Sequence, residues 1–176
     1  MPVTTLRSSV AVAVVAAGAM LLLAPASLGS SGRVSGDNIC TISSSSKWRQ
    51  LDSDVNSLGS KVSAAFSGGS VSDGVSAAKS IASKIRGERD LLAKASGSKK
   101  LKDALVTLYD RAAVMYDRLG QKLPTIAPFL ANMKKNPGDL KSMNKVMDAM
   151  ASVLQPAAQA LQKTGTIWSD AMKGCH

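Results

Sequence analysis

The sequence predicts an all-α protein: an up-down helical bundle of about four spanning helices plus a short capping helix, after a cleaved signal peptide. Apolar residues recur at spacings of three and four along most of the chain beyond residue 44, which is the period of an amphipathic helix. Aromatic residues make up only 3% of the chain, so a core must be built from Leu, Val, Ile, Met and Ala. This composition favours helices, because strands favour aromatic and β-branched residues.

The first 26 residues have the pattern of a signal peptide. A basic residue, Arg7, precedes an apolar run over 10–24, and Ala24-Pro25-Ala26 supplies the small residues that a signal peptidase recognises. Cleavage is expected after Ala26, with Gly29 as the second choice. An uncleaved anchor is the alternative, but the run is short for a bilayer, which needs about 20 apolar residues, and Pro25 interrupts it. We therefore expect a secreted protein, extracellular or associated with the cell envelope.

The chain contains two cysteines, Cys40 and Cys175, which enclose nearly all of the helical pattern. In an exported protein an even number of cysteines indicates a disulfide, although two free thiols or a bridge between chains are alternatives. A bridge within the chain requires both ends to meet, which an even number of spanning helices achieves. Residues 27–43 are rich in Gly and Ser and are expected to form a flexible lead-in. Residues 44–175 are then a single helical-bundle domain.

Two helices are predicted in the first half of this domain. The first follows a serine cap within 44–46 and ends at Ser67-Gly68-Gly69. The second covers about 71–95, and Gly74 and Gly87 weaken it by about 1 kcal/mol each relative to Ala. The apolar positions of the first stripe are Trp48, Leu51, Val55, Leu58, Val62 and Phe66, and those of the second are Val75, Ala78, Ile81, Ala82, Ile85 and Leu92.

The second half predicts a third spanning helix, a short helical piece and a last helix. The third helix carries Leu101, Leu105, Leu108, Ala112, Met115 and Leu119 on one face. Gly120 and Pro124 are expected to end it. The piece over 125–135 is too short to span the bundle and is expected to cap one end. After a turn at 136–138, Asp139 is a suitable N-cap for the last helix, which Pro156 should kink.

Catalytic residue types are scarce in this chain. The only histidine is the final residue, His176, and the only glutamate is Glu88. Most of the aspartates fall on polar helix faces, without the facing pair that acid–base catalysis uses. Neither a phosphate-binding glycine loop nor a cluster of metal ligands is present in the sequence. We therefore expect a protein that is not an enzyme and carries no metal or other cofactor.

The charge of the chain indicates a binding function instead. The formal net charge is +10, and basic residues gather around two of the predicted turns. The group between the second and third helices suggests an anionic cell-envelope polymer or an acidic protein surface as partner. Solubility alone is the alternative explanation. The residues predicted to bind the partner are Arg86, Arg89, Lys94, Lys99, Lys100 and Lys102; the second basic group is Lys122, Lys134, Lys135, Lys141 and Lys145.

A carrier of a small hydrophobic ligand or haem is the alternative function. Two phenols and a methionine stripe could line a pocket between helices. Thioethers and phenolates are also possible metal ligands, so the same residues could hold haem. The spacing of the methionines favours ordinary core packing, and the phenols could instead flank the core with their hydroxyls in solvent. The predicted pocket residues are Tyr109, Met115, Tyr116, Met143, Met147 and Met150.

Overall fold

A computed structural model describes residues 38–172 of the chain. Over this range it contains four α-helices, and no strand is formed. A 3₁₀ turn, η1 (Ile42–Ser44), precedes them. The helices are α2 (Ser46–Phe66), α3 (Val71–Lys94), α4 (Lys99–Lys135) and α5 (Leu140–Met172). The predicted all-α class is therefore confirmed, whereas the predicted signal peptide over 1–26 lies outside the described residues.

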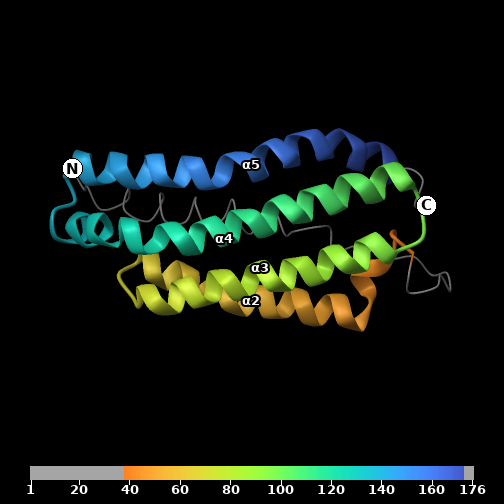
Figure 1. The fold of residues 1–176 in the computed structure, drawn as a ribbon, viewed down its shortest axis with the longest axis horizontal. Coiled ribbons are helices and arrows are strands. Elements are labelled where there is room, and N and C mark those ends of the chain that lie inside the picture. The colour runs from red at the N-terminus through yellow and green to blue at the C-terminus, as the bar shows by residue number, and fades with distance from the viewer. Residues whose placement is uncertain (1–37, 173–176) are drawn as a thin grey trace, which may run out of the picture.

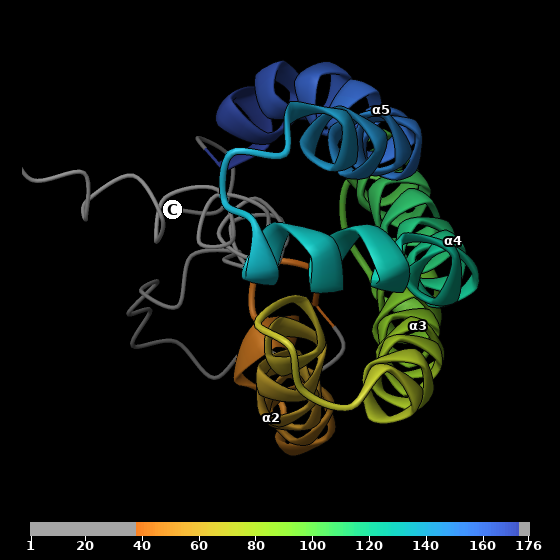
Figure 2. The same ribbon diagram turned by 90° about the vertical axis from the view of Figure 1, so that its left-hand side faces the viewer.

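The four helices pack side by side and alternate in direction (Figure 1). Each helix packs on the next one along the chain: α2 on α3, α3 on α4, and α4 on α5. The two outer helices, α2 and α5, are not packed against each other, so the helices form a curved, open row (Figure 2). Within residues 38–172, no helix combines the length and the apolarity that crossing a membrane requires.

Each helix begins at a side-chain cap. Ser45, Ser70 and Ser98 each accept a hydrogen bond from the backbone N–H three residues further on. The carboxylate of Asp139 accepts from the N–H groups of Lys141 and Ser142, each over 3.1 Å. These bonds satisfy backbone donors that have no partner inside the helix. The predicted caps at 44–46 and at Asp139 are therefore observed.

Part of the predicted flexible lead-in belongs to the folded structure. The backbone N–H of Ile39 donates to the carbonyl of Ser96 over 2.8 Å, which attaches the chain to the α3–α4 turn. The side chains of Ile39 and Ile42 are buried in the core. Gly97 makes room for this contact: it has φ +126, and a Cβ on it would lie 2.5 Å from Ile39 Cγ2. The folded region therefore begins no later than residue 38, because two isoleucines interrupt the Gly/Ser pattern and enter the core.

The predicted separate capping helix over 125–135 is not observed, because these residues are the last turns of α4. The helix continues past Pro124 and Pro128. Burial explains the continuation, since Leu123 and Ile126 are almost fully buried and hold the segment on the core. Figure 2 shows these last turns bending across the end of the row, toward the α2–α3 turn. A bend is the expected effect of proline inside a helix.

Both ends of the described chain lie at the same end of the row (Figure 1). This arrangement is the one that a bridge between Cys40 and Cys175 requires. The described part of the chain contains no free cysteine, but Cys175 lies outside that part. The pairing of the two cysteines therefore stays a prediction.

Candidate functional site

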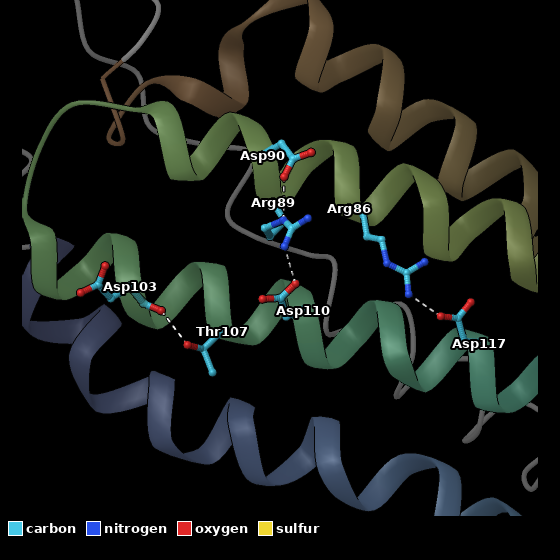
Figure 3. Close-up of polar contacts among 7 residues, drawn as sticks. All are labelled: Arg86, Arg89, Asp90, Asp103, Thr107, Asp110 and Asp117. Atoms are coloured by element: carbon cyan, nitrogen blue, oxygen red, sulfur yellow. Dashed lines mark hydrogen bonds and ion pairs between the residues drawn. The ribbon is translucent and has the colours of Figure 1, made fainter.

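The basic residues predicted to bind an anionic partner are divided between two kinds of environment. Arg86 of α3 forms an ion pair with Asp117 of α4. Arg89 forms a second one with Asp110 of α4 over 2.9 Å, and also contacts Asp90 over 2.8 Å. Figure 3 shows both arginines reaching from α3 across to α4. These two guanidinium groups therefore connect neighbouring helices and have their charge neutralised locally.

The lysines of the same group lie nearer the α3–α4 turn. Lys99 pairs with Asp103 one turn along α4, and Lys102 donates to the carbonyl of Ala95 over 3.2 Å. Lys94 and Lys100 are exposed and form no ion pair within the described residues. Four of the six predicted residues thus already have partners inside the protein.

A second group of cations lies where α4 ends and α5 begins. Lys135, Lys141 and Lys145 are exposed, and none of them is ion-paired to any residue that the structure describes. Lys141 stands in the first turn of α5, where a positive charge opposes the helix dipole. The carboxylate of Asp139 attracts the charge of Lys141, although the two side chains form no ion pair. Of the nearby acids, Asp139 is engaged as the helix cap and Asp148 is exposed.

Two large apolar side chains are exposed in the same first turns of α5. Leu140 is 66% exposed and Met147 is 54% exposed, and no other large hydrophobic side chain is exposed among those whose burial the structure describes (38–160 and 162–164). They are seven residues apart, which places them on the same face of α5, two turns apart. We call Leu140, Met147, Lys135, Lys141 and Lys145 the tip patch. Sequence reasoning grouped these lysines and interpreted Met147 as a core or pocket residue.

The residues predicted to line a ligand pocket differ in their burial. Tyr109, Met115, Tyr116 and Met150 are buried in the core, whereas Met143 is half-buried and Met147 is exposed. The burial of α5 instead follows Val146, Met150 and Val153. The alternative that the hydroxyls of both tyrosines reach solvent is wrong, because both side chains are buried. Tyr109 is only 4% exposed and makes an edge-to-face contact with Trp48 of α2, with 5.5 Å between ring centroids.

Glu88 is a buried acid that the sequence reasoning did not single out. It is 1% exposed, and its Oε1 has no hydrogen-bond partner. Burial, followed by the negative charge of Asp52, raises the pKa of Glu88 from 4.5 to about 8. Burial likewise raises the pKa of Tyr109, with a further contribution from Glu88. The signal was present in the sequence, because residue 88 continues the apolar stripe of Ile81, Ile85 and Leu92 at spacings of four, three and four.

The chemistry available at Glu88 is limited. Its carboxyl is mainly protonated at neutral pH, so it can donate or accept a hydrogen bond without carrying charge. Over the part of the chain that the structure describes, no group of three or more His, Cys, Asp or Glu residues is placed to hold a metal ion. The exposed tip patch is therefore the better candidate for recognition of a partner.

No protein-family model, no curated protein and no solved structure matches this chain. Its function therefore has to be inferred from its own residues.

Proposed function

We propose that the protein is an exported, non-catalytic helical protein that binds an anionic envelope or extracellular partner through the tip patch. The observation that carries the proposal is the difference between the two basic groups. Four of the six residues around the α3–α4 turn have internal partners, which leaves Lys94 and Lys100, whereas Lys135, Lys141 and Lys145 all lack an ion pair among the described residues. An exposed cation without an internal partner is available to an external anion.

Salt dependence supplies the test. Each lysine that releases a counterion from a polyanion contributes about 0.7–0.9 to the slope of log K against log salt. The triple variant Lys135→Gln, Lys141→Gln, Lys145→Gln should therefore lose about 2 units of slope on a heparin column. It should also elute at clearly lower salt than the unaltered protein.

The matched control removes the same charge from the other end of the row. Lys94, Lys99 and Lys100 are exposed, but Lys99 is already paired with Asp103, so their replacement by Gln should lower the elution salt less than the tip-patch variant does. Equal losses for the two triple variants would contradict a localised site. A larger loss for the control would place the site at the α3–α4 turn instead.

A further inference from the structure

The apolar residues of α5 form two adjacent stripes, of which only one is covered. The buried stripe consists of Val146, Met150, Val153, Ala157 and Ala160, with the buried polar residues Ser142 and Thr164 at its two ends. The second stripe follows spacings of three and four beside it and consists of Leu140, Met143, Met147, Ala151, Leu154 and Ala158. Its two half-buried members, Met143 and Leu154, lie at the border with the buried stripe. The apolar surface of α5 is therefore wider than its contact with the rest of the protein requires.

The place of α5 in the row explains why this stripe is uncovered. Among the described helices α5 packs substantially only against α4, because it stands at the edge of an open row (Figure 2). Each inner helix has neighbours on two sides, so its apolar residues can be covered from both. An edge helix needs one apolar stripe, and a second one is typical of a surface that meets another apolar phase.

Lysines accompany the uncovered stripe at its N-terminal end. Lys141 and Lys145 are one turn apart on α5, and Lys135 ends α4 only five residues before Leu140. A lysine stem can lie along an apolar surface while its ammonium group extends to a polar boundary. The helical period places Lys141 and Lys145 to one side of the stripe, about 100° or more round α5 from Leu140. Exposed leucine and methionine with lysines along one side match the interface of a bilayer that carries anionic headgroups.

We propose that the tip patch docks on the surface of an anionic lipid bilayer, with Leu140 and Met147 entering the headgroup region and the lysines binding lipid phosphates. This inference rests on the proposed function and names its partner. A soluble polyanion would satisfy the lysines but would leave both apolar side chains in water. A second copy of the chain would cover the apolar stripe but would bring two strongly basic molecules together.

The test separates the apolar from the charged contribution. The protein is purified as its producing cell exports it, its intact mass is recorded, and it is mixed with vesicles of phosphatidylcholine alone or with phosphatidylglycerol added. We expect binding to the anionic vesicles only. The variant Leu140→Gln, Met147→Gln should bind them at least 10-fold more weakly and keep its retention on heparin. The lysine triple variant of the tip patch should lose both activities, and circular dichroism should show that all variants remain helical.

Three results would overturn the lipid proposal. Unchanged vesicle binding by Leu140→Gln, Met147→Gln would show that these side chains do not enter the bilayer. Equal binding to the two kinds of vesicle would show that lipid charge is not recognised. Sedimentation velocity that reveals a dimer dissociated by the same double variant would show that a second copy covers the stripe. The proposed function is tested separately by heparin retention: it fails if the tip-patch lysine variant is retained like the unaltered protein, or if it loses no more retention than the control variant.

Discussion

Gly74 of α3 lies so close to Ala65 of α2 that a Cβ atom on the glycine would be 2.5 Å from the Cβ of the alanine. Real Cβ atoms do not approach to this distance, so one of the two helices would have to move. The glycine that weakens α3 as an isolated helix therefore allows it to pack closely on α2. Local propensity and tertiary packing act in opposite directions at this position.

Replacement of Gly74 by Ala should destabilise the protein. The added methyl group overfills a packed contact, which costs about 1–3 kcal/mol and outweighs the gain of about 1 kcal/mol in helix propensity. Gly59 of α2 is the matched control, because nothing lies within 4 Å of the place its Cβ would take. Gly59→Ala should stabilise by about 0.5–1 kcal/mol. Urea unfolding measures both, and the same sign for both would contradict the close contact.

The pH dependence of stability should reveal Glu88. In the folded protein its pKa is about 8, above the 4.5 of the unfolded chain. Between these values the folded protein retains a proton that the unfolded chain has released. The free energy of unfolding should therefore decrease as the pH rises from about 4.5 to about 8, and this decrease should end above pH 8.

Glu88→Gln should remove most of that decrease, because the amide does not titrate. The quantity to compare is the slope of unfolding free energy against pH between 5 and 8, since a constant offset from the new amide does not alter it. Tyr109→Phe is the control: burial keeps the pKa of the phenol above its ordinary value, so its removal should preserve the slope. A Glu88→Gln variant with the unaltered slope would show that Glu88 is not a buried, protonated acid.

The ion pair between Arg86 and Asp117 should contribute little to stability. Both side chains are partly exposed, at 42% and 35%, so water and salt screen their attraction. A double-mutant cycle with alanine at both positions should give a coupling below about 1 kcal/mol, which decreases further in high salt. Because both groups are engaged with each other, Arg86→Ala should also leave heparin retention nearly unchanged. A large loss of retention would return Arg86 to the binding surface.

The predicted bridge between Cys40 and Cys175 can be tested by its thiols and its stability. The unfolded, unreduced protein should show no reactive thiol, and peptide mapping should recover the two cysteines in one linked fragment. Reduction, or the variant Cys40→Ser, Cys175→Ser, should lower the free energy of unfolding by about 3–5 kcal/mol, because the closed loop is long. A reactive thiol before reduction, or a linked pair of chains, would contradict a bridge within one chain.

Much of the helical pattern could be predicted, because helices of this kind bury one stripe at a fixed period. The stripe that includes Trp48, Val55 and Val62 is buried as predicted, and the break at Gly68 and Gly69 separates α2 from α3. The end of α4 was predicted wrongly, because Gly120 and Pro124 are strong local signals for termination. The burial of Leu123 and Ile126 outweighs those signals.

The candidate site was only partly predictable. Sequence spacing placed lysines near each turn, but it could not show which ones have carboxylate partners on a neighbouring helix. Asp117 and Asp110 neutralise Arg86 and Arg89 across the α3–α4 contact, about twenty or thirty residues away along the chain. The spacing of apolar residues likewise could not show that Met147 is exposed. The side of an apolar helix that becomes buried depends on where its neighbours stand.

The sequence by itself determined that the chain is helical, where most helices begin and end, and that it is strongly basic, because periodicity, caps and charge are local properties. Only the tertiary structure decided that the four helices form an open row, that Glu88 is enclosed, and that Leu140 and Met147 remain exposed beside unpaired lysines. These features depend on which surfaces of distant helices meet, and an edge helix can leave uncovered an apolar stripe that its own sequence predicts to be buried.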